Sequence, residues 1–154
     1  TKVGYNVRMT DLQGALGVIQ TKKMDSLNNK RVKNSLYLEK LIKENLNEYF
    51  LTVSNIKNYY NSRYTFPIII KKNKKFNRKI ICEFLEKNKI QTRPMMGGCL
   101  PDQPGLRKEN GKVIGNLKIS RYIKNNCFFV GVHPLVTKQK YDLMINLIKM
   151  LLDE

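Results

Sequence analysis

A short polar loop that runs straight into an apolar helix is the feature that most restricts how this chain can fold. The loop occupies residues 4–9 (Gly-Tyr-Asn-Val-Arg-Met), and Thr10 and Gln13 follow it. Thr followed three positions later by Gln is a capping box, in which both side chains bind backbone N–H groups at a helix start. Apolar residues then recur at helical spacing, at Leu12, Ala15, Leu16 and Ile19. The segment predicts a loop and a helix with one apolar face that must be covered.

The apolar pattern weakens between residues 22 and 29 and resumes between Val32 and Leu46. It predicts either two helices or one long helix bent near residues 25–29. We expect the first part of this helical region to be poorly covered by the rest of the chain, or to pack against a second copy.

The middle of the chain alternates segments typical of strands and of helices. Residues 64–70 are rich in β-forming residues and predict a short strand. Pro67 lies within this strand and indicates an edge position or a bulge, because proline cannot donate to a ladder. Residues 76–88 then predict a helix, and residues 90–93 predict a second short strand.

The C-terminal third begins with a loop and ends with a helix. Glycine and proline recur between residues 94 and 115, which predicts a long loop. Residues 127–132 predict a buried strand, and Thr137 is placed to cap a last helix. The whole pattern predicts one α/β (α+β) unit, with a small mixed or antiparallel sheet and helices packed on one face.

The net charge of +17 raises nucleic acid as a partner. However, the lysines are dispersed and accompany many Asn and Ile residues, as an AT-rich coding sequence produces. The densest cluster, residues 71–75, lies between a strand and a helix and is typical of a solvated turn. We therefore expect no nucleic-acid partner. A basic nucleic-acid-binding domain and a noncatalytic interaction module remain the alternatives from other classes.

The cysteine spacing and the hydropathy of the chain exclude further classes of protein. The cysteines Cys82, Cys99 and Cys127 are far apart and form no C-x-x-C pair. This spacing argues against a disulfide framework or a zinc site and favours a reducing cytoplasm. No apolar run reaches the roughly 18 residues of a membrane-spanning helix, so we expect no membrane span.

The opening loop and helix resemble those of the DegT/StrS family of pyridoxal-phosphate (PLP) sugar aminotransferases and dehydrases. The resemblance is dense over residues 4–27 and 89–104 and looser elsewhere. It implies that residues 1–27 are a loop and linking helix at the end of a large domain. Residues 28–154 would then be the C-terminal small domain of a fold-type I PLP-dependent transferase.

The resemblance also implies roles for the opening loop. In this family the equivalent asparagine contacts PLP held by the other subunit of a homodimer, so Asn6 is the implied ligand of the cofactor phosphate. Tyr5 and Arg8 are the other candidates for the cofactor site, and they would shape the loop and its dimer contact. The residues alone allow a plainer interpretation, in which these side chains only begin a helix.

A second block, residues 90–104, resembles a narrower subgroup, the CDP-4-keto-6-deoxyglucose 3-dehydrases of lipopolysaccharide biosynthesis. Its sequence is Ile-Gln-Thr-Arg-Pro-Met-Met-Gly-Gly-Cys-Leu-Pro-Asp-Gln-Pro, with Cys99 where the subgroup commonly has asparagine. The candidate substrate-binding residues are Arg93, Gly97, Gly98 and Gln103. Arg93 suits an anion, and glycines let backbone approach a ligand closely. Alternatively, Arg93 pairs with a carboxylate and the glycines only turn the chain.

The resemblance implies a nucleotide-sugar 3-dehydrase that uses PLP or pyridoxamine phosphate (PMP), with an aminotransferase of the same family as the alternative. The Schiff-base lysine, or the histidine that replaces it, would lie upstream, so we expect no catalytic residue in this chain and no activity from it alone. Use of an iron–sulfur cluster stays open. His133 ends a predicted strand, and we expect it to have a structural role.

Overall fold

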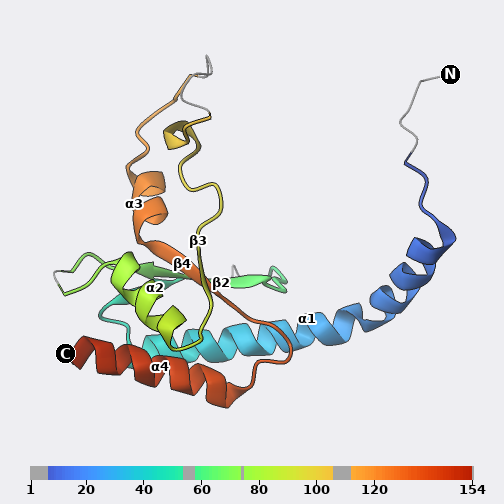
Figure 1. Ribbon diagram of the computed structural model, residues 1–154, viewed down its shortest axis with the longest axis horizontal. Coiled ribbons are helices and arrows are strands. Elements are labelled where there is room, and N and C mark those ends of the chain that lie inside the picture. Colours follow the sequence, from blue (N-terminus) through green and yellow to red (C-terminus); the bar gives the residue numbers. More distant parts are fainter. Residues whose placement is uncertain (1–6, 54–57, 74, 106–111, 154) are drawn as a thin grey trace.

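The computed structural model describes residues 7–53, 58–73, 75–105 and 112–153 (Figure 1). Its centre is a four-stranded sheet in the order β1-β2-β4-β3. All the pairings are antiparallel. The strands are β1 (Phe50–Thr52), β2 (Thr65–Ile70), β3 (Thr92–Pro94) and β4 (Cys127–Gly131). The predicted small antiparallel sheet is confirmed.

Three helices cover one face of this sheet and enclose a single core. They are α1 (Asp11–Asn45), α2 (Arg78–Lys87) and α4 (Lys138–Asp153). Figure 1 shows the C-terminal half of α1 running beside α4 beneath the sheet. The core combines apolar side chains of these helices with those of the two central strands: Leu38, Ile42, Ile81, Leu85, Tyr141, Met144, Ile145, Ile148, Phe66, Ile68, Ile70, Phe128 and Val130. Burial of this apolar surface is the main source of the stability of the domain.

The sheet has a second face that these helices do not cover, which we call the open face. Side chains alternate along a strand, so Phe66, Ile68 and Ile70 of β2 enter the core while Thr65 and Pro67 point the other way. Pro67 lies opposite Phe129, and Phe129 lies opposite Arg93. Directly opposite residues share a face, so Arg93, Phe129 and Pro67 form a row across the open face.

The opening helix is a single helix rather than two. The capping box is present: the Gln13 N–H donates to Thr10 Oγ1 (3.4 Å), and the Thr10 N–H donates to Gln13 Oε1 (2.9 Å). The first residue of α1 to be buried is Ser35. Figure 1 shows the N-terminal half extending well away from the sheet, and its apolar side chains are exposed, as with Leu12 at 73%. The prediction that the rest of the chain covers this half poorly is confirmed for the described residues.

The prediction for Pro67 is wrong for the strand as a whole, because β2 is a central strand. The local geometry explains why proline is tolerated there. β1 pairs only with residues Ile68–Ile70 of β2, so at Pro67 the strand has β4 as its one partner. A missing N–H donor is tolerated at such a locally unpaired edge.

The predicted loop after β3 contains a short 3-10 turn, η1 (Leu100–Asp102), and leads to a helix that the sequence pattern did not predict, α3 (Lys118–Asn126). α3 contacts β2 and β4, and none of its residues is buried. Figure 1 shows α3 and η1 projecting from the sheet. This projecting unit forms one wall of the site described next.

Candidate functional site

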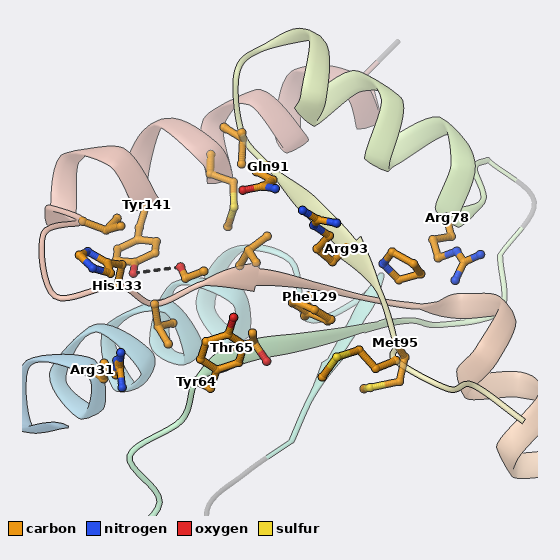
Figure 2. Close-up of a pocket in the computed structure, with 18 of the residues that line it drawn as sticks. Arg31, Tyr64, Thr65, Arg78, Gln91, Arg93, Met95, Phe129, His133 and Tyr141 are labelled. Carbon is orange, nitrogen blue, oxygen red and sulfur yellow. Dashed lines mark hydrogen bonds between the residues drawn. The ribbon is translucent and has the colours of Figure 1, made fainter. Parts of the chain in front are cut away.

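A pocket of about 970 Å³ lies on the open face and continues past β3 to the start of α4 (Figure 2). Thr65 of β2 and Phe129 of β4 line it from the sheet, and Arg93 lines it from β3. Tyr141 and His133 line its other end. Residues from both central strands, one edge strand and four helices therefore converge on one concavity.

The charge of this pocket is one-sided. Six lysine or arginine residues line it, and no Asp or Glu is among the lining residues that the structure describes: Arg31, Arg78, Lys89, Arg93, Lys124 and Lys140. Figure 2 shows Arg31 and Arg78 at opposite ends, with Arg93 between them. Clustered cations in a concave site attract and hold anionic ligands.

Arg93 is the cation that lies over the sheet itself. With the Gln91 amide oriented so that its oxygen faces Arg93, that oxygen accepts bonds from Nε (3.2 Å) and Nη2 (3.0 Å). No ion pair between described residues includes Arg93, so the pairing with a carboxylate that the sequence also allowed is not formed in this part of the chain. An exposed guanidinium oriented by one amide suits bidentate recognition of a phosphate or carboxylate.

The glycine loop, residues 95–105, forms the pocket rim next to Arg93. Gly97 and Gly98 line the pocket and have φ values of +71° and +53°, which favour glycine. Gln103 donates from Nε2 to the Gly97 carbonyl oxygen (2.9 Å) and closes the loop on itself. The four residues predicted to bind substrate, Arg93, Gly97, Gly98 and Gln103, therefore lie together. Their contact with a ligand stays a prediction.

One carboxylate ties the glycine loop to α3. Asp102 accepts hydrogen bonds from Arg121 Nη2 (3.2 Å) and from Lys124 Nζ (3.3 Å). The Arg121 guanidinium, and to a smaller extent the Lys124 ammonium, hold the pKa of the Asp102 carboxyl below its ordinary value of 3.8. An opposite charge at hydrogen-bond distance favours the ionised form in this way.

We expect the Asp102 carboxyl to titrate below pH 3.8 in the folded protein. Because the folded-state pKa is lowered, its contribution to stability is complete above the unfolded value and is lost as pH falls through the folded value. Carboxyl-carbon NMR across an acid titration measures the midpoint. In Arg121→Ala the midpoint should move upward, and an unchanged midpoint would contradict the contact.

Of the candidates for the cofactor site, only Arg8 is among the described residues, and it does not line this pocket. Tyr5 and Asn6 lie outside the described residues, and Arg8 is exposed next to the start of α1. From Asp11 to Arg31, the pocket residue on α1, the helix rises about 30 Å. The start of α1 and the pocket are therefore far apart along the helix.

His133 makes hydrogen bonds through its ring and its backbone, and its structural role stays a prediction. Its Nδ1 accepts a hydrogen bond from the Leu135 N–H (3.2 Å), and its carbonyl oxygen accepts one from Asn34 Nδ2 (2.9 Å). The cysteines are free, with Cys99 and Cys127 buried. Burial raises the pKa of the Cys82 and Cys127 thiols. The described residues contain no cluster of three or more His, Cys, Asp or Glu side chains able to hold a metal ion.

Sequence reasoning missed the other cations of the pocket. Arg31, Arg78 and Lys140 lie on three different helices and meet only in the folded chain. Arg78 also has a structural role, because its Nη1 donates to the Lys124 carbonyl oxygen (2.8 Å) at the end of α3. No local sequence pattern indicates that these three cations line a pocket or that Arg78 contacts α3. No helix in the described ranges has the length and apolar character needed to cross a membrane.

The chain is similar to curated proteins of nucleotide-sugar metabolism. It is 28% identical over 144 residues to the lipopolysaccharide biosynthesis protein RfbH of Salmonella typhimurium, covering 94% of this chain and 33% of that protein. It is 30% identical over 147 residues to a GDP-4-keto-6-deoxy-D-mannose 3-dehydratase of Escherichia coli O55:H7, covering 95% of this chain and 37% of that protein. The chain thus spans about a third of the length of these curated relatives.

A solved structure shows the same fold. It is described as E. coli GDP-4-keto-6-deoxy-D-mannose-3-dehydratase with bound hydrated PLP, and it superposes with a TM-score of 0.82 at 29% identity. The match covers 94% of this chain and 36% of that chain. The family model described as DegT/DnrJ/EryC1/StrS aminotransferase family matches residues 1–149. These matches confirm the resemblance of residues 4–27 and 89–104, and the chain belongs to the DegT/DnrJ/EryC1/StrS aminotransferase family.

Proposed function

We propose that this chain is the C-terminal part of a PLP- or PMP-dependent nucleotide-sugar 3-dehydratase of lipopolysaccharide biosynthesis. Its substrate is a 4-keto-6-deoxy sugar nucleotide. The observation that carries the proposal is the pocket on the open face, which six cations line without a carboxylate among its described residues. The diphosphate of a nucleotide sugar is the anion that such a pocket fits. The names of the relatives support the reaction and the pathway.

In this proposal the pocket residues bind and orient the substrate. Arg93 holds the diphosphate by the Nη1 and Nη2 donors at the end of its guanidinium, and Gln91 orients the guanidinium through Nε and Nη2. Gly97 and Gly98 bring loop backbone close to the sugar nucleotide, and Gln103 stabilises the loop in that position. The apolar ring of Phe129 lies beneath, where it excludes water from one side of the ligand.

The opening loop serves a different site. The residues of this loop that suit contact with a phosphorylated cofactor are Arg8, Tyr5 and Asn6. Arg8 is an exposed cation just before the capped helix α1. The distance between this loop and the pocket supports a role in the partner subunit of a homodimer. Residues 1–27 then belong with the large domain and residues 28–154 form the small domain. When bound, PLP or PMP supplies an electron sink.

The chain by itself is not proposed to turn over substrate. Its relatives are about three times as long, and none of the pocket residues is assigned a proton-transfer role here. The intact protein is proposed to be a cytoplasmic homodimer that does not bind nucleic acid.

The product of the intact protein tests this function. We expect a 4-keto-6-deoxy sugar nucleotide, incubated with PLP and glutamate, to lose its C3 oxygen, as mass spectrometry and NMR of the product would show. The family description also names aminotransferases, so a product that gains an amine would assign the chain to that branch. Recovery of unchanged substrate from folded, cofactor-loaded protein, across several nucleotides, would overturn both assignments.

A further inference from the structure

We propose that Asp102 is a positioning residue for the pocket. With Arg121 and Lys124 it forms a clamp that fastens the glycine loop to α3, and the clamp holds Gly97 and Gly98 at the pocket rim. The inference rests on the proposed function, since it assumes that the glycine loop touches the sugar nucleotide.

The first step is that α3 is fixed to the sheet by polar contacts. None of its residues is buried, so apolar packing does not hold it firmly. The Tyr122 hydroxyl donates to the Ile70 carbonyl oxygen (2.7 Å) at the end of β2. Arg78, at the start of α2, donates to the carbonyl oxygens of Lys124 (2.8 Å) and Cys127 (3.4 Å). Two elements of the core thus fix α3, which gives the loop a support.

The second step is that the loop has little apolar packing of its own. Cys99 is the one buried side chain among its residues, 95–105, all of which the structure describes. Met96 and Leu100 are 75% and 58% exposed. A segment with so few buried contacts opens at low free-energy cost unless other contacts hold it.

The third step is the geometry of the clamp. The Asp102 carboxylate accepts from Arg121 Nε at 3.3 Å and Nη2 at 3.2 Å, and from Lys124 Nζ at 3.3 Å. Its side chain is only 21% exposed, against 53% for Arg121. One carboxylate thus bridges two cations that lie one turn apart on α3, which fixes both the position and the orientation of η1.

The fourth step is the close approach of the loop to α3. A Cβ placed on Gly98 would lie 3.0 Å from Lys124 Cγ, and the φ of +53° is also unfavourable for other residues. Gly98 is therefore required partly because the loop presses against Lys124. Lys124 and Gly98 both line the pocket, so the clamp and the ligand site share a wall.

Asp102→Asn tests the inference, with two readouts. In the 154-residue chain, we expect the amide signals of Gly97 and Gly98 to shift and their hydrogen exchange to speed up. In the intact protein, the Kd for nucleoside diphosphates (CDP, GDP and UDP as probes) should rise about threefold to tenfold, the size expected for losing exposed ion pairs. Thermal stability should change little, because the clamp is at the surface.

Two variants serve as controls. Asp102→Glu keeps the charge and should keep both readouts near the wild-type values. Glu83→Gln removes an exposed ion pair with Lys79 on α2 (3.9 Å), away from the pocket, and should leave the loop and the Kd unchanged.

The outcomes separate the clamp from the proposed function. Unchanged Gly97 and Gly98 signals in Asp102→Asn would overturn the clamp, whatever the ligand. If the glycine loop of Asp102→Asn is disordered while the Kd is unchanged, Asp102 has no positioning role in ligand binding. If the wild-type intact protein binds none of the three nucleotides, the proposed function fails, and the amide readout still decides the clamp.

Discussion

Phe66→Ala is expected to lower the free energy of unfolding by about 3–5 kcal/mol, the usual cost of truncating a buried aromatic ring. Phe66 is fully buried in the core between the sheet and its helices. It also lies on β2, which pairs with both β1 and β4. The cavity left by its ring would therefore weaken the packing of the whole sheet against α1 and α4.

Urea denaturation followed by circular dichroism measures this loss. Tyr59→Ala is the matched control, because it truncates an aromatic ring that is 73% exposed and should change stability by less than about 0.5 kcal/mol. Equal effects of the two substitutions would mean that Phe66 is not in the core.

Arg93→Ala should weaken binding of a nucleotide sugar to the intact protein about tenfold to a hundredfold. The substitution removes a charge-assisted contact worth about 1.5–3 kcal/mol. Stability should hardly change, since Arg93 is exposed and has no ion pair with the described residues. Isothermal titration with a nucleoside diphosphate measures the affinity, and urea denaturation measures the stability.

Two further variants make the Arg93 experiment specific. Arg93→Lys keeps the charge but loses the two-pronged donor, so part of the loss should persist. Lys79→Ala removes a cation that is 81% exposed on α2 and does not line the pocket. If Lys79→Ala weakens binding as much as Arg93→Ala, the affinity comes from the overall charge of +17 rather than from the pocket.

Much of the fold was predictable because apolar residues recur at regular spacing in the segments that form the core. The capping box at Thr10, the buried strand β4 and the apolar face of α4 all lie where the sequence indicates. β3 begins two residues later and ends one residue later than predicted, at Thr92–Pro94. β1 was missed because a strand of three residues is too short to show alternation.

α3 was missed for a different reason. It follows a stretch rich in glycine and proline, and its N-cap, Leu117, makes no side-chain capping bond. Ile119, Tyr122 and Ile123 do recur at helical spacing and could have revealed it. The grouping of Arg93 with the glycine loop was accessible from family resemblance. The cations that join them from α1, α2 and α4 were not, because only tertiary packing unites them.

The length of α1 gives the domain mechanical leverage. Burial of α1 in the core begins at Ser35, so the part of the helix from Asp11 to Ser35, about 36 Å long, extends beyond the core (Figure 1). A tilt of the domain by about 5° would therefore move the start of α1 at Asp11 by about 3 Å. The length of α1 alone would therefore turn a small rotation of the sheet domain into a displacement of the first helical residue about as large as a hydrogen-bond length.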